Sequence, residues 1–363
     1  MPSVSREDGS SPTRTRPSGG RNSGVAFLTH LHAYRGVVIN EMEATIKRRG
    51  FHRALAKRLA EYPLRAGKGL RPALCLACCQ AYGGAPEDAL PSAVALELFH
   101  NAFLVHDDIE DESIHRRGSP TMHKKYGTAI AINVGDALNV LSMTPLLDNL
   151  RVIGLEKTLR VFKEIERMAR ESVEGQAMEL DWVRSGEWRL TDRSYLVMTT
   201  KKTCWYTCIS PCRVGAIIAL GSQADLDALE IFGYHLGVAF QIQDDVLNLV
   251  AEEERYGKET AGDIWEGKRT LMLINLVRSC NARERARVVR IMGKPRDRKS
   301  EAEVQYVLSL MDRYGSVDYA RGVSRAHARK AALAFERLFA TAQDSPHKAF
   351  LREAIEYVID RDL

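Results

Sequence analysis

Two short acidic clusters carry the chemistry that this sequence predicts. The first is DDIED at residues 107–111 and the second is DDVLN at residues 244–248, and each lies in an otherwise apolar stretch. Residues four positions apart share one face of a helix, so the first and last side chains of each cluster project together. Like charges in an apolar setting are costly unless a cation relieves them. Two such faces in one cavity would bind hard cations, and Mg²⁺ fits best because it bridges carboxylates to phosphates. The clusters therefore predict a metal site for a diphosphate.

Basic residues beside glycines supply the cations that the remaining phosphate oxygens require. Gly67 and Gly69 loosen a loop that enters a helix and carries Lys68 and Arg71, a good anion cradle because the helix dipole adds to the charges. Each basic residue alone fits an ordinary surface charge, but five such groups beside glycine or an acidic cluster indicate phosphate binding. The groups are Lys68 with Arg71, Arg116 with Arg117, Lys201 with Lys202 and Thr203, Lys258, and Lys268.

His100 lies seven residues before Asp107, two helical turns away on nearly the same face. A lone helical histidine is usually structural, whereas one beside an acidic cluster is also suited to contact phosphate. The residues alone leave both roles open.

The bulk composition bounds the classes of function. The 363 residues are 45% hydrophobic, enough to bury a large core, and the formal net charge of +5 is too modest to indicate nucleic-acid binding. No stretch approaches the roughly twenty apolar residues of a membrane span, so no transmembrane segment is expected. The seven cysteines form no evenly spaced framework and follow no secretory signal, which favours reduced thiols in a cytoplasmic protein. Cys204, Cys208 and Cys212 recur every four residues, but nothing nearby completes a zinc pattern, so we expect them to be buried core side chains.

Helices must position these groups. Residues 1–24 are rich in Ser, Arg, Gly and Pro and are expected to be a disordered tail. Over residues 25–363, apolar residues recur at three- and four-residue spacings, with breaks at Gly-, Pro- or Asp-rich pieces such as residues 83–88. Strand-type alternation and internal repeats are absent from the sequence. The pattern predicts a single all-α domain of about ten or more helices. The basic stretch at 281–300 is expected to be a solvated helix face and loop rather than a docking site.

The ordered motifs resemble those of the trans-isoprenyl diphosphate synthases, also called polyprenyl synthetases. GKGLRP is similar to the family's isopentenyl diphosphate loop, DDIED followed by RRG to its first aspartate-rich motif, and FQIQDDVLN to its second. KKT and GKETAGDIWEGKRT fall at the family's intervals, and the resemblance runs from about residue 60 to 275. One DDxxD motif is weak evidence, whereas several motifs in the right order are highly specific. The resemblance implies the isoprenoid-synthase bundle, an all-helical fold around a central cavity, in a homodimer.

The resemblance also implies a mechanism and a role for each residue. Isopentenyl diphosphate condenses head to tail with an allylic diphosphate, through ionisation of the allylic substrate, attack by the isopentenyl double bond and loss of a proton. Mg²⁺ is the implied cofactor, with three ions expected and Mn²⁺ able to substitute. The implied metal ligands are Asp107, Asp108, Asp111 and Asp244, and the implied catalytic residues are Asp107, Asp111, Arg116, Lys202 and Asp244. The implied allylic diphosphate pocket comprises Arg116, Lys202, Thr203, Gln241, Asn248, Lys258 and Lys268, and the implied isopentenyl diphosphate site comprises Lys68, Arg71, His100 and Arg117.

Two local features bear on activity and product length. Asn248 ends the second motif where many family members have Asp; Asn can still coordinate weakly or hydrogen-bond the diphosphate, and a similar ending occurs in eukaryotic-type geranylgeranyl diphosphate synthases. In the family, bulky residues four and five positions before the first motif form the floor of the product tunnel. Here Phe103 is aromatic, Ala102 leaves an opening, and Phe99 lies one turn further. The resemblance therefore favours geranylgeranyl diphosphate (C20), then farnesyl diphosphate (C15), then longer products, unless another helix builds the floor.

Two rival functions share part of this pattern. A class I terpene cyclase also uses a DDxxD motif with Mg²⁺, but it has no need of a second diphosphate site, so GKGLRP and Arg117 argue against it. A non-catalytic partner subunit of a heteromeric synthase typically loses one acidic cluster, and this chain keeps both.

Overall fold

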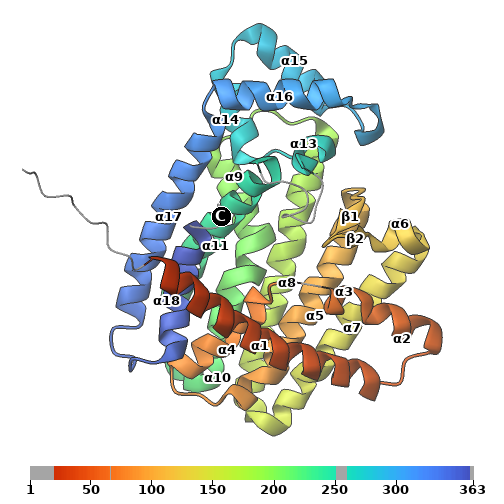
Figure 1. The fold of residues 1–363 in the computed structure, drawn as a ribbon. Helices are drawn as coiled ribbons and strands as arrows, with labels where there is room; N and C mark the ends of the chain where they lie inside the picture. Colours follow the sequence, from red (N-terminus) through yellow and green to blue (C-terminus); the bar gives the residue numbers. More distant parts are fainter. Residues whose placement is uncertain (1–19, 66, 251–259, 360–363) are drawn as a thin grey trace, which may run out of the picture.

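The computed structural model describes residues 20–65, 67–250 and 260–359 of the chain. These residues are almost entirely helical, which confirms the all-α prediction (Figure 1). The first half contains α1 (Gly20–Arg48), α2 (Arg53–Leu59), α3 (Glu61–Leu64), α4 (Leu70–Ala81), α5 (Pro86–Glu110), strands β1 (His115–Arg116) and β2 (Ser119–Pro120), α6 (Met122–Tyr126), α7 (Thr128–Val152) and α8 (Gly154–Ser185). The second half contains α9 (Asp192–Thr199), η1 (Thr200–Ile209), α10 (Ser210–Leu220), η2 (Gly221–Gln223), α11 (Leu226–Val250), α13 (Gly262–Glu266), α14 (Leu271–Ser279), α15 (Ala282–Met292), η3 (Arg296–Arg298), α16 (Glu301–Arg313), α17 (Ser316–Leu338) and α18 (Pro346–Ile359).

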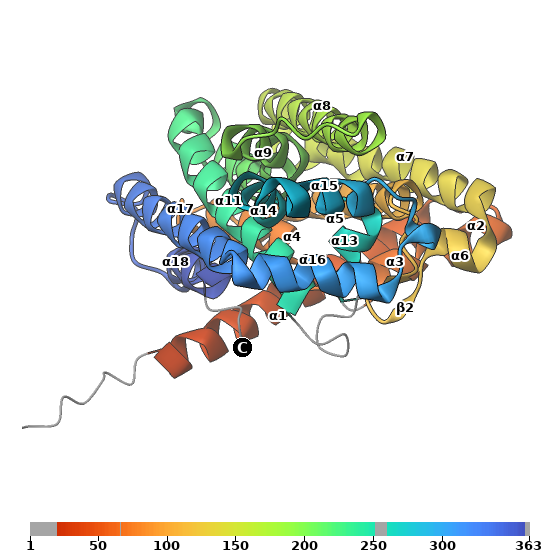
Figure 2. The same ribbon diagram turned by 90° about the horizontal axis from the view of Figure 1, so that it is seen from above.

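The long helices pack side by side in one bundle (Figures 1 and 2). The most extensively paired helices are α5 with α7, α11 with α17, and α4 with α10. Helices α15 and α16 lie across one end of the bundle, at the top of Figure 1, and α1 and α8 lie on opposite edges in the view of Figure 2. The bundle therefore has one end covered by two short crossing helices.

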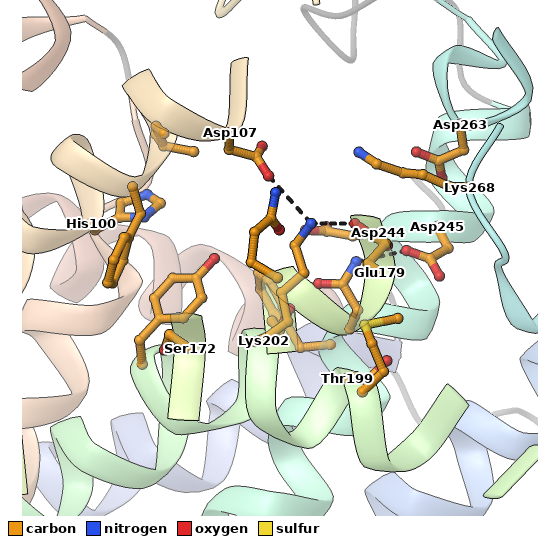
Figure 3. A pocket seen from close by; sticks show the side chains of 18 of the residues that line it. His100, Asp107, Ser172, Glu179, Thr199, Lys202, Asp244, Asp245, Asp263 and Lys268 are labelled. Atoms are coloured by element: carbon orange, nitrogen blue, oxygen red, sulfur yellow. Dashed lines mark hydrogen bonds and ion pairs between the residues drawn. The ribbon is translucent and has the colours of Figure 1, made fainter. Parts of the chain in front are cut away.

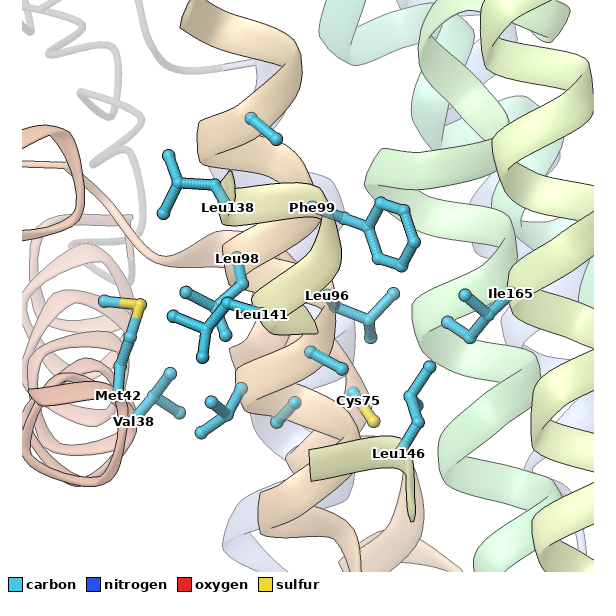
Figure 4. Close-up of a cluster of buried hydrophobic side chains, with 14 of the residues drawn as sticks. Val38, Met42, Cys75, Leu96, Leu98, Phe99, Leu138, Leu141, Leu146 and Ile165 are labelled. Carbon is cyan, nitrogen blue, oxygen red and sulfur yellow. The ribbon is translucent and has the colours of Figure 1, made fainter. Parts of the chain in front are cut away.

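Buried apolar side chains form three clusters that hold the bundle together. One surrounds α5 and α7, one lies between η1, α11 and α14, and one lies between α4, α10, α11 and α17. In the first, Val38 and Met42 of α1 pack on one side of α5, and Phe99 and Ile165 lie on the other (Figure 4). Helix α5 is thus buried against neighbours on most of its circumference, which fixes the direction of its side chains.

The ends of α5 place the first acidic cluster beside a tight turn. The helix begins at Pro86, whose missing N–H costs nothing in a first turn. After its last residue the chain turns through Glu112 and Arg117, which adopt φ values of 52° and 54°. The turn contains the β1–β2 hairpin, in which Arg116 pairs with Ser119. The hairpin corrects the expectation of no strands, because two-residue strands leave no alternation in a sequence. It returns Arg116 and Arg117 to the end of α5.

A wide helical turn carries a further basic residue of the site. The helix that Thr191 caps, by a reciprocal capping box with Ser194, continues through the π-helix η1 into α10. π-helical turns are rare and concentrate at functional sites, and here η1 carries Lys202. Helix α8 approaches η1 closely at Gly175, where a Cβ would lie 2.1 Å from the Lys202 backbone nitrogen. A glycine is therefore required for α8 and η1 to meet at this distance.

Two smaller expectations have clear outcomes in the fold. Residues 1–19 of the expected tail lie outside the described residues, but α1 begins at Gly20, so the end of that segment is helical rather than part of a tail. All seven cysteines are buried and free, and Cys204, Cys208 and Cys212 lie in η1 and α10, as predicted for small core side chains.

Two helical stretches meet the length and composition of a membrane span, which corrects the expectation that none would. They are Thr128–Val152 and Asp192–Gln223. The second has 83% of its apolar window buried inside the fold, as is typical of a core helix, whereas the first has 44%. The rest of the first stretch exposes apolar side chains that continue onto α8. We call this surface the α7–α8 face and define it by four exposed side chains, which are Val140, Leu147, Leu155 and Leu159.

Candidate active site

A single cavity of about 1000 Å³ receives residues from nearly every predicted motif. It lies between α5, α8, η1, α11 and α13 and the loop before α4 (Figure 3). The predicted residues that line it are Lys68, Arg71, His100, Phe103, Asp107, Arg116, Arg117, Lys202, Thr203, Gln241, Asp244 and Lys268. Predicted residues that do not line it are Phe99, Ala102, Asp108, Asp111 and Asn248, and Lys258 lies outside the described residues.

The first acidic cluster meets two lysines at the cavity wall. The Asp107 carboxylate lies 3.2 Å from Lys202 Nζ and accepts a hydrogen bond of 3.2 Å from Arg116. Asp111, the last residue of the cluster, accepts a hydrogen bond of 2.6 Å from Lys268. Burial raises the pKa of Asp111 to about 7, although Lys268 acts in the opposite direction. Asp107 and Asp111 are thus each paired with an ammonium group, but of the two only Asp107 lines the cavity.

Asp108 has a different role from the metal ligand that was predicted. Its side chain is fully buried and accepts hydrogen bonds from the Tyr62 hydroxyl (2.7 Å) and from Arg116 Nε (2.9 Å). Successive helical residues point about 100° apart, so Asp108 faces the hairpin while Asp107 faces the cavity. The prediction that Asp108 binds metal is therefore wrong for this structure: its carboxylate holds Arg116 in place.

The second acidic cluster faces the first across the cavity, with Lys202 between them (Figure 3). Asp244 and Asp245 of α11 both line the cavity. Burial raises the pKa of Asp245 to about 7, against hydrogen bonds from the Tyr195 hydroxyl (2.7 Å) and Gln241 Nε2 (2.6 Å) that lower it. Gln241 therefore contacts the second cluster, whereas it was predicted to contact the diphosphate.

Asn248 stabilises a turn instead of lining the cavity as predicted. Its Oδ1 accepts a hydrogen bond of 3.0 Å from the Asp263 N–H, and its carbonyl accepts one of 2.7 Å from the Ala261 N–H. Ala261 has a φ of 57°, which a non-glycine residue rarely adopts, so the turn needs such support. The turn brings Asp263 into the cavity wall. Sequence reasoning missed Asp263, although it is the aspartate inside the motif GKETAGDIWEGKRT.

The donors around the cavity suit hard cations. Among the described residues no three His, Cys, Asp or Glu side chains are gathered closely enough to hold a metal ion. Lys202 bridges Asp107 and Glu179, and Lys268 bridges Asp111 and Glu266. Burial lowers the pKa of each lysine, but the surrounding carboxylates raise it above the ordinary value. The carboxylates thus require positive partners, and their all-oxygen donor set fits Mg²⁺.

The opposite side of the cavity holds the basic loop and His100. Arg71 donates 2.9 Å to Thr207, lies 3.2 Å from His100 Nε2 and stacks 4.4 Å above the Tyr206 ring. Lys68 lies 5.5 Å above the Tyr357 ring of α18. Burial, with Arg71 and its neighbours, lowers the pKa of His100 well below its ordinary value. His100 is therefore a neutral ring in contact with an arginine, and it belongs to the anion site rather than to a separate core.

Further functional residues appear only in three dimensions. Glu97 lies in the cavity wall beside the arginines, Glu179 pairs with Lys202, and Tyr206 faces both Arg71 and Phe103. Local spacing carried no signal for Glu179 or Tyr206, because both come from segments far from the acidic clusters. Glu97 lies one turn before His100, a position that could have been noticed. None of residues 281–300 lines the cavity.

The predicted tunnel floor is only partly present. Phe103 lines the cavity, and its ring meets Tyr206 edge-on at 6.0 Å and Phe99 at 6.1 Å between ring centres. Ala102 is fully buried in the core cluster around α5 and does not line the cavity, which corrects the expectation that it leaves an opening. The reason is again the 100° step along a helix, which turns Ala102 away from Phe103.

Comparison with known proteins agrees with this geometry. The chain matches the model of the polyprenyl synthetase family over residues 53–311. It is 34% identical to the short chain isoprenyl diphosphate synthase of Methanothermobacter thermautotrophicus, over 84% of this chain and 90% of the relative. It is 33% identical to the geranylgeranyl diphosphate synthase of Sulfolobus acidocaldarius, over 81% of this chain and 87% of the relative. The crystal structure of geranylgeranyl pyrophosphate synthetase from Pyrococcus horikoshii aligns with a TM-score of 0.81 and 31% identity, over 94% of this chain and 100% of that one. The chain therefore belongs to the polyprenyl synthetase family of prenyl-transferring enzymes.

Proposed function

We propose that this enzyme condenses isopentenyl diphosphate with an allylic diphosphate and releases geranylgeranyl diphosphate (C20). The observation that carries the proposal is one cavity whose two sides each gather charged side chains suited to an anion. Two facing acidic clusters with lysines lie on one side, and Lys68, Arg71 and Arg117 lie on the other. A substrate pair that carries two diphosphates needs both sites, whereas a single diphosphate substrate needs one.

The acidic side is the site of ionisation. Asp107 of α5, Asp111 directly after that helix, and Asp244 of α11 would hold three Mg²⁺ ions, with Mn²⁺ able to substitute. When bound, the metal neutralises the departing diphosphate and so favours cleavage of the allylic C–O bond. Lys202 and Lys268 bind oxygens of the same diphosphate, since their ammonium groups already lie against Asp107 and Asp111. Arg116, Thr203 and, outside the described residues, Lys258 complete this pocket.

The basic side orients the nucleophile. Lys68, Arg71 and Arg117 bind the isopentenyl diphosphate head group, and the neutral His100 ring donates a further hydrogen bond from Nδ1, which has no partner among the described residues. The isopentenyl double bond then attacks the allylic cation, and the proton that is lost goes to the released diphosphate. Phe103 and other apolar lining residues exclude water, which would otherwise quench the cation.

Aromatic side chains of the cavity wall bear on the length of the product. Phe103 and Tyr206 both line the cavity with their rings in edge-on contact, which we interpret as an aromatic constriction, and Phe99 packs against Phe103. A partial constriction of this kind supports C20, ahead of farnesyl diphosphate (C15) and longer products. Relatives are named for several chain lengths, including geranylfarnesyl diphosphate synthase from Aeropyrum pernix and octaprenyl diphosphate synthase from Haemophilus influenzae.

The deciding experiment incubates purified enzyme with Mg²⁺, labelled isopentenyl diphosphate and allylic diphosphates of C5, C10 and C15. A labelled C20 alcohol after phosphatase treatment is the expected product. Diphosphate release without isopentenyl diphosphate, together with a cyclic hydrocarbon, would indicate a terpene cyclase. No turnover on any allylic primer would indicate a non-catalytic partner subunit.

The proposed enzyme is a cytoplasmic homodimer with one helical domain over residues 25–363. The α7–α8 face supports the dimer, because monomers rarely leave side chains such as Val140 (68% exposed) and Leu155 (64%) together at the surface. Sedimentation of the wild type and of Leu155→Glu tests this, with a monomer expected only for the variant.

A further inference from the structure

The basic side of the cavity contains a buried carboxylate to which the proposed mechanism gives no role. Glu97 is 7% exposed and lines both the large cavity and a small pocket behind residues 67–69. It precedes Asp107 by ten residues, about 15 Å along α5 at 1.5 Å per residue. Glu97 therefore belongs to the isopentenyl diphosphate side and not to the metal side.

Guanidinium groups from three elements surround this carboxylate without pairing with it directly. Arg35 of α1 and Arg117 of the hairpin line the small pocket together with Glu97, and Arg71 of α4 lines the large cavity with it. All three act on Glu97 electrostatically. Ion pairs between described residues do not include Glu97, and its carboxylate accepts a long hydrogen bond of 3.4 Å from Asn101. The electrostatic attraction between Glu97 and the guanidinium groups therefore acts without a direct ion pair. The guanidinium N–H groups can still donate hydrogen bonds to another anion.

The arginines themselves are held by contacts that leave their charge uncompensated. The Arg117 guanidinium packs against Gly67, where a Cβ would lie 2.7 Å from its central carbon, and it donates 3.4 Å to the Tyr62 carbonyl. Arg71 is held by Thr207 and His100, both neutral. Burial lowers the pKa of Arg117, and Glu97 is the neighbour that raises it. Buried cations without a counter-charge are strongly destabilising, so the free enzyme needs this carboxylate.

We propose that Glu97 is the resident counter-charge of the isopentenyl diphosphate site: it stabilises Arg71 and Arg117 in the free enzyme and takes up one proton from solvent when the substrate diphosphate becomes their partner. The inference rests on the proposed function of this site. A bound diphosphate places negative charge beside the carboxylate, and a nearby like charge favours the neutral acid. The carboxylate gains a proton and no other bond changes.

The surroundings make Glu97 the group that changes charge. Burial already raises the pKa of Glu97 above its ordinary value, although Arg117 and Arg71 oppose this. His100 stays neutral, because its pKa is lowered. The remaining titratable groups that line this side are the Tyr206 phenol and six basic side chains, which are Arg35, Arg65, Lys68, Arg71, Arg116 and Arg117.

The proposal has a definite sign with pH. Below the pKa of Glu97 in the free enzyme, the acid is neutral before and after binding, and affinity does not depend on it. Above that pKa, each binding event consumes one proton, so the apparent Kd for isopentenyl diphosphate rises up to about tenfold per pH unit. The rise ends above the pKa of Glu97 in the complex.

The test is calorimetric titration of the full-length enzyme with isopentenyl diphosphate, without allylic substrate, in two buffers of different ionisation enthalpy. Wild type is compared with Glu97→Gln, and Glu87→Gln is the matched control, because Glu87 is an exposed residue of the same helix. Relative to Glu97→Gln, the wild type and the control should each bind as much as about one additional proton per substrate molecule. The slope of log Kd against pH should differ between these proteins and Glu97→Gln by as much as about one. Steady-state kinetics at pH 8.5 should show a lower KM for isopentenyl diphosphate in Glu97→Gln than in the wild type.

Equal proton uptake and equal slopes in wild type and Glu97→Gln would overturn the inference and leave the proposed function intact. Absence of binding in the wild type would overturn both. Should Glu97→Gln fail to fold, the number of protons that the wild type takes up per substrate molecule decides whether the inference holds. At pH 8 the free diphosphate is already fully ionised and releases no proton on binding, so net uptake by the wild type there supports the role of Glu97 and its absence contradicts it. Glu97→Asp, which keeps the charge, should retain the proton uptake.

Discussion

Asp108→Asn separates a structural carboxylate from a metal ligand. Asp108 is fully buried and accepts hydrogen bonds from Arg116 and from Tyr62. The substitution removes the negative partner of a buried guanidinium while keeping the side-chain shape. Breaking one partner of a buried ion pair costs about 3–5 kcal/mol, because it leaves an uncompensated buried charge. We therefore expect the free energy of unfolding to fall by about that amount.

The neighbouring residue is the matched control. Asp107 lies at the cavity wall with its side chain 22% exposed, and it pairs with Lys202 and Arg116 at 3.2 Å. Partly exposed pairs contribute little, so Asp107→Asn should change the free energy of unfolding by less than about 1 kcal/mol. Its turnover should fall by at least about a thousandfold, because it removes a group that acts on the developing diphosphate charge.

The assay is urea denaturation followed by circular dichroism, with turnover measured on the same preparations. The two variants should show opposite patterns: Asp108→Asn loses stability first, and Asp107→Asn loses activity with stability retained. An Asp108→Asn enzyme as stable as the wild type, with Mg²⁺ dependence weakened as in Asp107→Asn, would refute the structural role and restore Asp108 as a metal ligand.

Three further predictions test other parts of the structure. Phe103→Ala opens the aromatic constriction and should lengthen the main product by at least one C5 unit in thin-layer or mass analysis; unchanged length would place the floor elsewhere. Gly175→Ala puts a Cβ 2.1 Å from the Lys202 backbone nitrogen, so it should lower the free energy of unfolding by about 1–3 kcal/mol and reduce turnover. Burial lowers the pKa of His327 to about 4. The folded state therefore binds fewer protons than the unfolded state between pH 4 and 6.5, and stability falls as pH is lowered through that window, by about 2 kcal/mol after solvent screening. His327→Gln should flatten this dependence in denaturation measured at pH 4.5 and 7, and an unaltered slope would contradict the assignment.

Much of the site was readable from residue types and short spacings. The position of Asp107 at the first acidic cluster, the glycines around Lys68 and the order of the motifs are local properties, and the fold brings Asp107, Gly67, Lys68 and Gly69 to one cavity. Asp108 and Asn248 were misassigned for a related reason. A motif names adjacent residues together, although adjacent side chains on a helix point about 100° apart and meet different neighbours.

The sequence by itself determined the helical architecture, the acidic and basic groups and their order along the chain, because periodicity and composition act within a few residues. Only the tertiary structure decided which aspartates face the cavity, that Asn248 supports the turn of Asp263, and that Ala102 is turned into the core. It alone placed Glu97 among arginines from three separate elements. The physical reason is that a side chain's direction is set by its own helix, whereas its burial, partners and pKa depend on segments far away in the chain.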